Sequence, residues 1–299
     1  MRFTKRRLIL GILAVFLLIF LYRLLTVYTV RSGECRPRPV DPDLRLVTRD
    51  EHGRLVSFPE RIGFPPQRRP LVVMTYNMAG HDELIDGDHM RRIADVILRI
   101  RPDLVALQEV HRKTWQARFR DQLAELESLT GLHGFFAPSY VQGEGGYGNA
   151  ILTRGQILHA EAYPLPCVGE PRMLLEAKVR IDGATIRFYA THLTTWGRLN
   201  AKVREEQLHC LARVVRTSRD PYILAGDFNT PPEAPEMEAF RRENAAQLAT
   251  EAVGPTFPLW KEQIDYIFAD YGWQVRSART WPVDVSDHLP VTAELMWGR

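Results

Sequence analysis

Cysteine is scarce in this 299-residue chain, and its three cysteines follow no familiar spacing. An odd number in a chain of this length is no disulfide framework, and the intervals between Cys35, Cys167 and Cys210 match no zinc-binding pattern. Buried or inert thiols are expected, and a bridge between Cys167 and Cys210 is the alternative if the domain lies in an oxidising compartment. The cysteines therefore exclude a disulfide-rich scaffold.

Internal repeats and low-complexity segments are also absent, as are two catalytic signatures. The sequence contains neither the serine turn of a nucleophile elbow nor a glycine-rich phosphate-binding loop. With 45% hydrophobic and 25% charged residues, the composition is that of an ordinary globular protein. Repeat architectures and serine-based hydrolysis are therefore disfavoured.

An excess of positive charge is missing from most of the chain, although the formal net charge is +3. Residues 71–299 contain 25 Lys and Arg against 30 Asp and Glu, a net charge of −5. The excess of cations lies in residues 1–70. This acidic balance weakens the case for a broad basic surface that binds nucleic acid.

The first 30 residues have the pattern of a membrane-spanning helix. Four basic residues lie within the first seven, and residues 8–30 form a 23-residue, largely apolar stretch that contains Arg23. This length suffices to cross a bilayer. The positive-inside rule then places the N-terminus in the cytoplasm and the catalytic domain on the extracytoplasmic side. The alternative is a cleaved signal peptide and a secreted protein.

Residues 31–70 are predicted to be a linker rich in proline and arginine, with a short hairpin conceivable over 44–48 and 54–58. Residues 71–299 are predicted to be the catalytic domain. Apolar residues at helical spacing predict helices over 89–100, 115–129 and 201–215. Short apolar runs predict strands over 71–78, 104–107, 150–153, 173–181, 185–190, 222–225, 264–268, 273–278 and 290–296. This alternation predicts an α/β fold with two sheets faced by helices.

Polar side chains stand at the ends or starts of many of these strands. In chain order they are Asn77, Glu109, His192, Asp227, Asn229, Asp265, Asp287 and His288. Because strand ends can direct side chains into one cleft, we expect a single site. Carboxylate and amide oxygens suit Mg²⁺ or Mn²⁺, and imidazoles stabilise charge and transfer protons. The set predicts metal-dependent hydrolysis of phosphate esters.

Seven short motifs follow one another along residues 71–299. They are Tyr-Asn77, Leu-Gln-Glu109, Gly-Asn149-Ala-Ile-Leu, Thr-His192-Leu, Gly-Asp227-Phe-Asn229, Ile-Asp265-Tyr-Ile and Ser-Asp287-His288. Their order resembles that of the endonuclease/exonuclease/phosphatase superfamily, which includes DNase I. The resemblance implies a DNase I-like four-layered α/β sandwich, in which two mixed β-sheets are flanked by helices.

The resemblance also implies a metal site. Glu109, with Asn77 close by, is similar to the principal Mg²⁺ site of the superfamily. Asp287 resembles the carboxylate that helps to hold the ion directly or through water. The expected cofactor is therefore Mg²⁺, with Mn²⁺ as a possible substitute.

Five further positions match catalytic residues of the superfamily. Asp227 resembles the residue that orients or deprotonates the attacking water, and Asn229 would bind the scissile phosphate. His288 resembles the imidazole that stabilises the transition state, with Asp265 fixing its tautomer. His192 matches the second histidine of the DNase I and sphingomyelinase branches. Apurinic endonucleases usually have a tyrosine there, so abasic-site repair is disfavoured.

Two other residues are candidate substrate contacts. Asn149 follows a glycine-rich approach and could present its amide to the substrate, or it could form a turn. Arg172 begins a strand and could clamp a phosphate. The alternative for Arg172 is an exposed side chain at the start of a strand. Trp196 and Trp260 could line the substrate groove or pack in the core.

The expected function is that of a membrane-anchored, Mg²⁺-dependent phosphodiesterase acting on a lipid headgroup or a small phosphodiester. The alternative is a DNase I-like endonuclease, for which Arg198, Lys202 and Arg204 would contact the nucleic-acid backbone. These cations could equally meet an anionic headgroup. A third hypothesis, an inactive family member that serves as a binding module, is disfavoured by the intact motif set. No obligate protein partner is predicted.

Overall fold

The computed structural model describes residues 35–37 and 69–298, apart from residues 196, 245 and 252. The predicted membrane span, most of the predicted linker and the conceivable hairpin lie outside these residues. Within the described part of the chain, no helix has both the length and the apolar character needed to cross a membrane.

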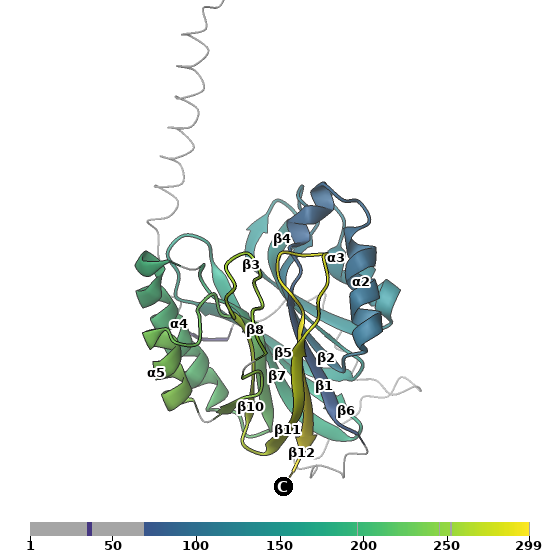
Figure 1. The fold of residues 1–299 in the computed structure, drawn as a ribbon. Coiled ribbons are helices and arrows are strands. Elements are labelled where there is room, and N and C mark those ends of the chain that lie inside the picture. Colours follow the sequence, from purple (N-terminus) through teal and green to yellow (C-terminus); the bar gives the residue numbers. More distant parts are fainter. Residues whose placement is uncertain (1–34, 38–68, 196, 245, 252, 299) are drawn as a thin grey trace, which may run out of the picture.

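Two mixed six-stranded sheets lie at the centre of the domain (Figure 1). The strands of the first, in spatial order, are β11 (Trp273–Thr280), β12 (Val291–Trp297), β1 (Leu71–Asn77), β2 (Leu104–Arg112), β4 (Gly145–Thr153) and β3 (His133–Gln142). Those of the second are β5 (Gln156–Leu165), β6 (Arg172–Ile181), β7 (Ala184–His192), β8 (Tyr222–Asp227), β10 (Asp265–Asp270) and β9 (Ala246–Leu248). Each sheet contains one parallel pair, β1–β2 in the first and β7–β8 in the second.

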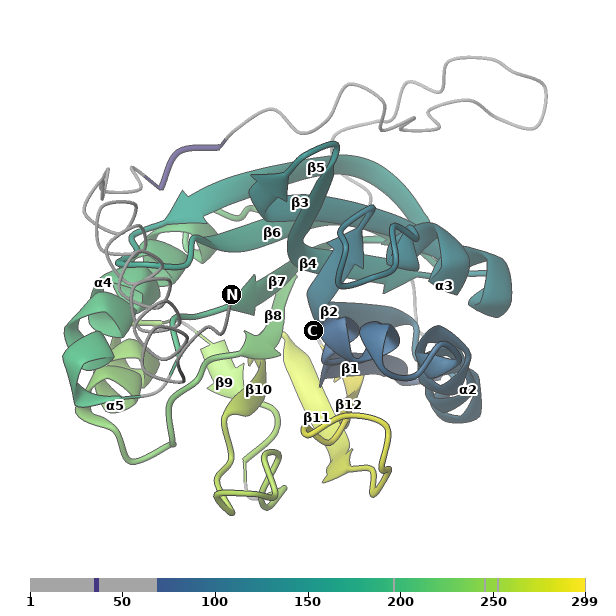
Figure 2. The same cartoon turned by 90° about the horizontal axis from the view of Figure 1, so that it is seen from above.

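Helices cover the outer face of each sheet (Figures 1 and 2). On the first sheet these are α2 (His89–Ile100) and α3 (Gln122–Thr130), and on the second α4 (Arg198–Val215) and α5 (Pro235–Glu243). One apolar cluster fills the space between the sheets, and two others lie between a sheet and its helices. The predicted four-layered sandwich is confirmed.

Helix α2 begins and ends at the predicted residues, whereas α3 begins seven residues later than predicted. The side chain of Asp121 caps α3 by accepting a hydrogen bond from the backbone N–H of Ala124 at 3.1 Å. Before this cap, Lys113, Arg118 and Phe119 have positive φ angles. Because an α-helix of L-residues requires negative φ, the segment before Asp121 forms turns instead.

The alternative bridge between Cys167 and Cys210 is wrong, and so is the expectation that Cys210 is an inert thiol. Cys210 on α4 forms a disulfide with Cys35, and the Cα atoms are 5.9 Å apart. Cys167 is a free thiol. Cys35 packs against the cluster that holds Cys210. The segment at 35–37 is therefore joined covalently to the helix layer of the second sheet, although 31 residues whose placement is not described separate it from the domain along the chain.

Candidate active site

The candidate residues lie at one edge of the two sheets, which we call the site edge. Strands β1, β2, β7 and β8 end there, and β10 and β12 begin there. Strand pairing places Asp227 opposite Asp265 and beside His192. Across the gap between the sheets, Nδ2 of Asn77 donates to Oδ2 of Asp227 at 3.1 Å. The topology thus unites residues 150 positions apart in the chain.

Glu109 lies where β2 bulges, so its side chain departs from the regular alternation of the strand. The pairing of β2 with β4 changes register between Leu107 and Val110, and Glu109 has a φ of 60°. Its Oε1 accepts a hydrogen bond from Nδ2 of Asn77 at 3.1 Å, and its Oε2 lies 3.4 Å from Nδ1 of His81. Burial opposes ionisation, but the bond from His81 and other interactions lower the pKa of Glu109 to about 2. Glu109 is therefore an anion at neutral pH.

Asp227 lies at the centre of the site and is fully buried. Its Oδ1 accepts a hydrogen bond from the backbone N–H of Asn229 at 2.8 Å. Its Oδ2 faces Nε2 of His192 at 3.4 Å and Nε2 of His288 at 3.8 Å. Burial and the charge of Asp265 raise the pKa of Asp227 to about 7. Its carboxylate can therefore accept a proton near neutral pH.

His288 forms a hydrogen-bonded pair with Asp265. The distance from its Nδ1 to Oδ2 of Asp265 is 2.9 Å, and the ring of Phe257 lies 4.8 Å from its own ring, centroid to centroid. Burial disfavours the charged imidazole, but Asp265 and then Asp227 raise the pKa of His288 to about 10. At neutral pH, His288 is consequently a cation with an N–H directed at Asp227. Oδ1 of Asp265 has no hydrogen-bond partner among the described residues.

His192 lies on the other side of Asp227 and has the opposite charge state. Nη1 of Arg172 lies 3.1 Å from Nδ1 of His192. A guanidinium only donates, so Nδ1 accepts and the proton of the neutral ring lies on Nε2, which faces Asp227. Burial and the charge of Arg172 lower the pKa of His192 well below its usual value. His192 is therefore a neutral donor to Asp227.

Asn229 and Asp287 also lie at the site edge. Nδ2 of Asn229 donates to the backbone carbonyl of Leu193 at 3.1 Å, and the residue has a φ of 50°. Asp287 is exposed, and its Oδ1 lies 3.3 Å from the hydroxyl oxygen of Ser286. That hydroxyl also contacts the backbone carbonyl of Asn77 at 2.8 Å. Asp287 is thereby held beside the end of β1.

The two candidate substrate contacts are both buried. Nδ2 of Asn149 donates to the backbone carbonyl of Met173 at 3.1 Å, so Asn149 lies in a strand and links β4 to β6. Arg172 is 3% exposed, and the expectation of an exposed arginine at a strand start is wrong. Besides His192, its Nη1 contacts Glu170 at 2.9 Å, and its buried Nε has no hydrogen-bond partner among the described residues.

The predicted cationic cluster of Arg198, Lys202 and Arg204 cannot contact an anionic substrate with all three side chains. Arg204 is buried and forms an ion pair with Glu236 at 2.8 Å, because α4 packs against α5 at this point. Lys202 is exposed. Trp260 is half exposed, whereas Trp196 lies outside the described residues.

The donor set around Glu109 fits a hard divalent cation. Glu109 is ionised and partly exposed, and Asp287 is close enough for its charge to act on both His81 and His288. Asn77 points its Nδ2 at two carboxylates, while its Oδ1 accepts a hydrogen bond from the N–H of Ala79. In this orientation Asn77 positions the carboxylates and does not present its oxygen to a cation.

A second group of possible ligands comprises Asp227, Asp265 and His288, whose ligand atoms lie within 4.8 Å of one another. Two of the three are already paired by the hydrogen bond between His288 and Asp265. That pairing favours a proton-transfer role for this group, and the Glu109 side remains the better candidate for the metal.

One residue of the site was missed by sequence analysis. His81 lies in the short 3₁₀ helix η1 (Gly80–Leu84), and the hydrogen bond to Glu109 raises its pKa. Its only signal in the sequence is its position four residues after Asn77. A Cβ added at Gly80 would lie 2.2 Å from the backbone carbonyl of Glu109, so glycine is required for η1 to approach β2.

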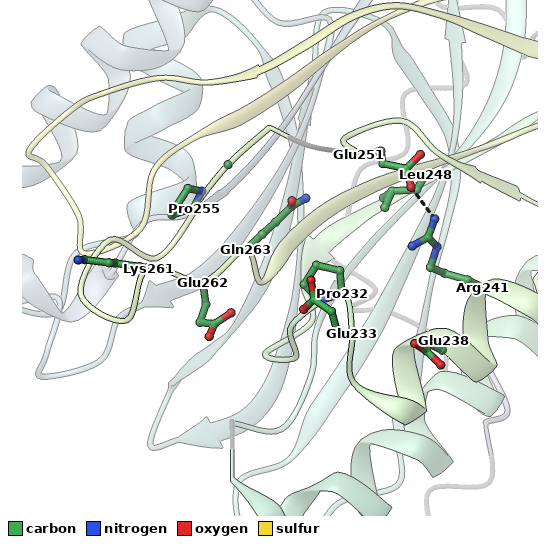
Figure 3. Close-up of a pocket in the computed structure, with 11 residues that line it drawn as sticks. Pro232, Glu233, Glu238, Arg241, Leu248, Glu251, Pro255, Lys261, Glu262 and Gln263 are labelled. Carbon is green, nitrogen blue, oxygen red and sulfur yellow. Dashed lines mark hydrogen bonds and ion pairs between the residues drawn. The ribbon is translucent and has the colours of Figure 1, made fainter.

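A cavity of about 590 Å³ lies between α5 with the loop before it and the segment that joins β9 to β10, and none of the predicted site residues lines it (Figure 3). Four glutamates and two cations are among its lining residues: Glu233, Glu238, Glu251, Glu262, Arg241 and Lys261. Arg241 is already paired with Glu251 at 2.8 Å. The acidic lining does not suit an anionic phosphate ester, so the cavity is separate from the site.

Comparison with known proteins agrees with this geometry. A sequence model of the Endonuclease/Exonuclease/phosphatase family matches residues 74–288. A solved endonuclease/exonuclease/phosphatase of Beutenbergia cavernae is 26% identical, with a TM-score of 0.63 over 77% of this chain and 72% of that chain. No curated protein gives a significant match.

Two further solved structures are similar in fold. The human Nocturnin catalytic domain is 22% identical, with a TM-score of 0.62 over 77% of this chain and 94% of that chain. A mannosyl-6-phosphatase of Bacteroides thetaiotaomicron is 21% identical, with a TM-score of 0.61 over 76% of this chain and 99% of that chain.

Proposed function

The chain belongs to the endonuclease/exonuclease/phosphatase family, and on that premise we propose that it is a membrane-anchored, Mg²⁺-dependent phosphodiesterase. The family's description covers nucleases and phosphatases, which share the hydrolysis of phosphate esters. The proposed substrates are a lipid headgroup or a small phosphodiester.

One observation carries the proposal. A buried carboxylate, Asp227, lies between a neutral imidazole and a charged one, within reach of an ionised Glu109 through Asn77. Hydrolysis of a phosphate ester needs a base for water and positive charge for the phosphoryl oxygens. This arrangement supplies both at neutral pH.

In the proposed mechanism, Asp227 accepts a proton from the attacking water, since its raised pKa matches neutral pH. The water oxygen bonds to phosphorus as the P–O bond to the leaving group breaks, and the leaving oxygen takes a proton from solvent. The imidazolium of His288 stabilises the negative charge that develops on the phosphoryl oxygens, and Asp265 holds this ring in place. His192 donates to Asp227 and keeps its carboxylate oriented. Asn229 is proposed to bind the scissile phosphate.

Glu109 and Asp287 are the residues proposed to hold Mg²⁺, with Mn²⁺ as a substitute. The ion would supply Lewis-acid polarisation of a phosphoryl oxygen. Asn77 fixes the carboxylate of Glu109, and its bond to Asp227 couples the two halves of the site. Arg172 is proposed to act through His192, with no direct contact to substrate.

The proposed location is extracytoplasmic, with residues 8–30 as a single membrane span and the N-terminus in the cytoplasm. The disulfide between Cys35 and Cys210 supports this side of the membrane, because such bonds persist mainly in oxidising compartments. Secretion after signal cleavage is the alternative, and it is compatible with the same disulfide.

The test uses the full chain purified in detergent, beside its His288→Ala variant. Hydrolysis of bis(p-nitrophenyl) phosphate, phospholipid headgroups and supercoiled plasmid is measured with Mg²⁺, with EDTA, and after Mg²⁺ is restored. We expect EDTA-sensitive hydrolysis of the small diester and of lipid that falls about 10²-fold or more in the variant. Cleavage of plasmid alone would make the protein a nuclease. Folded protein with no activity on any ester would identify an inactive binding module.

A further inference from the structure

Exposed apolar side chains are concentrated at the site edge. The described residues include twelve large hydrophobic side chains that are exposed, and eight of these lie in loops or at element ends at the edge where β1, β2, β3 and β5 end. The eight come from five separate segments, at residues 84–85, 115–119, 141, 168 and 259–260. Scattered single apolar residues need no explanation, but such a bias towards one edge does.

We define the apolar rim as the six most exposed members of this group, five on loops and one, Val141, near the end of β3. They are Ile85, Trp115, Phe119, Val141, Leu259 and Trp260, which are 50% to 83% exposed. All six contribute aromatic or branched aliphatic side chains.

The loop between β2 and α3 combines apolar tips with positive charge. Trp115 and Phe119 stand in a segment, residues 110–120, that contains four Arg or Lys and no Asp or Glu. Exposed Lys113 and Arg118 are close neighbours of the two aromatic residues in sequence. Trp260 is likewise followed by exposed Lys261. Aromatic rings beside cations are typical of segments that rest on the headgroup layer of a bilayer.

Several residues of these loops have a left-handed backbone conformation, which glycine adopts more readily than residues with a side chain. Lys113, Arg118, Phe119 and Lys261 have φ between 51° and 62°. Backbone hydrogen bonds from Lys113 to Arg120 and from Phe119 to Thr114 close the first loop. The protein therefore keeps bulky, exposed side chains at positions where they are conformationally unfavourable, which is common at binding sites.

Acidic residues near the rim are partly neutralised. Glu83 forms an ion pair with Arg120, and Asp86 pairs with Arg92 at 3.1 Å. The charge beside Ile85 is thereby reduced. Within residues 110–120, Arg112 and Arg120 are ion-paired, whereas Lys113 and Arg118 form no ion pair with the described residues and are the cations beside the aromatic tips.

The disulfide places the end of the predicted membrane span within reach of the site edge. Cys210 is the thirteenth residue of α4, about 18 Å along the helix from its start beside the site edge. Four residues, 31–34, lie between position 30 and Cys35, and the five residue-to-residue steps can span at most about 17 Å. A membrane span that ends near position 30 can therefore enter the same bilayer that the rim would touch.

We propose that the apolar rim docks on a phospholipid bilayer and presents the active site to phosphate esters of lipid headgroups. This inference rests on the proposed hydrolytic function and names the substrate class for it. A bilayer fits better than nucleic acid, because the aliphatic tips Ile85, Val141 and Leu259 neither pair with a phosphate backbone nor stack on bases, whereas they gain from burial among acyl chains.

The test uses the full chain reconstituted in vesicles of phosphatidylcholine and phosphatidylserine with brominated acyl chains, which quench tryptophan at membrane depth. All six tryptophans lie after residue 114, so the predicted span adds no fluorescence. We expect quenching in the parent protein that is largely lost in Trp115→Phe/Trp260→Phe. Trp297→Phe, at the opposite edge, should keep it. No quenching in the parent, or equal quenching in the double variant, overturns the proposal.

Activity provides the second readout. Phe119→Ser/Leu259→Ser should lower hydrolysis of vesicle phospholipid about tenfold or more and leave the rate on bis(p-nitrophenyl) phosphate unchanged. Leu98→Ser, an exposed leucine on α2, is the matched control and should change neither rate. Loss of plasmid cleavage in the double variant without loss of lipid hydrolysis would make the rim a nucleic-acid surface and overturn the proposal. A parent inactive on every ester, yet quenched in vesicles, would instead contradict the proposed function.

Discussion

His192 and His288 lie on opposite sides of one carboxylate, yet the structure gives them opposite charge. Both face Oδ2 of Asp227, and both are buried, at 3% and 6% exposure. Arg172 stands behind His192, and Asp265 stands behind His288. Burial alone would leave both rings neutral, so the neighbour behind each ring decides its charge.

The opposite charge states give the two histidines different roles in catalysis. A charged ring can stabilise negative charge on a phosphoryl group, whereas a neutral ring with a fixed tautomer can orient Asp227 without competing for its proton. Each of the following predictions tests one side of this contrast.

The largest effect is expected from removing the two rings separately. His288→Ala should lower kcat by about 10²-fold to 10³-fold, because it removes the charge that stabilises the transition state. His192→Ala should cost about tenfold, since Asp227 keeps its other partners. Steady-state kinetics on bis(p-nitrophenyl) phosphate measure both, with exposed His209→Ala as the control. Equal losses in the two variants would contradict the division of roles.

Replacing Asp265 should move the alkaline limb of the pH–rate profile. In the parent protein, activity should rise as Asp227 loses its proton near pH 7 and fall as His288 loses its proton near pH 10. Asp265→Asn removes the main group that raises the pKa of His288, so the alkaline limb should move to lower pH. Activity at pH 9 should fall about tenfold relative to activity at pH 7.5. An unmoved alkaline limb would show that another group titrates there.

Replacing Arg172 should make the acid side of the profile steeper. Burial, the larger cause of the lowered pKa of His192, remains after the replacement, but loss of the cation raises that pKa, so a charged His192 forms at a higher pH than in the parent protein. Arg172→Met should therefore lose a further few-fold of activity between pH 7.5 and pH 6. Arg172→Lys should restore most of the parent profile because it keeps the charge. A profile for Arg172→Met parallel to that of the parent would limit Arg172 to packing.

The smallest effect is expected on the pH dependence of the free energy of unfolding, measured in EDTA so that no metal is bound. The pKa of His192 is lowered in the folded state, so unfolding takes up a proton and stability falls as the pH drops below about 6.5. The pKa of His288 is raised, so its stabilisation is complete below about pH 6.5 and is lost as the pH rises through about 10. His192→Gln should flatten the acid side of a Tm-against-pH curve, and His288→Gln the alkaline side. Thermal melts from pH 5 to pH 10 compare the two.

Much of this site could be predicted from sequence, because its residues follow short apolar runs with clear motifs. Asp227 and Asn229 follow the β8 run directly, and strand pairing then determines their neighbours. The position of Arg172 could not be predicted, since burial of a strand-start arginine depends on contact with a ring 20 residues away. His81 carried no motif, and its contact with Glu109 depends on a β-bulge.

Elements of the fold without a clear local sequence pattern were likewise not predicted. Strands β3 and β5 were missed because prolines and polar residues interrupt their alternation, as Pro138 and Pro164 do. Helix α5 was missed because it is short and largely polar. The pairing of Cys35 with Cys210 joins positions 175 residues apart, so local pattern carries no information on it.

The most direct test of the contrast between the two histidines is their protonation state. Long-range ¹H–¹⁵N NMR of the imidazole nitrogens, in the metal-free full chain at pH 8, assigns the proton on each ring, with His192→Gln and His288→Gln used to identify the signals. The account predicts a neutral His192 with its proton on Nε2 and a His288 protonated on both nitrogens. Two neutral rings, or a charged His192, would contradict it.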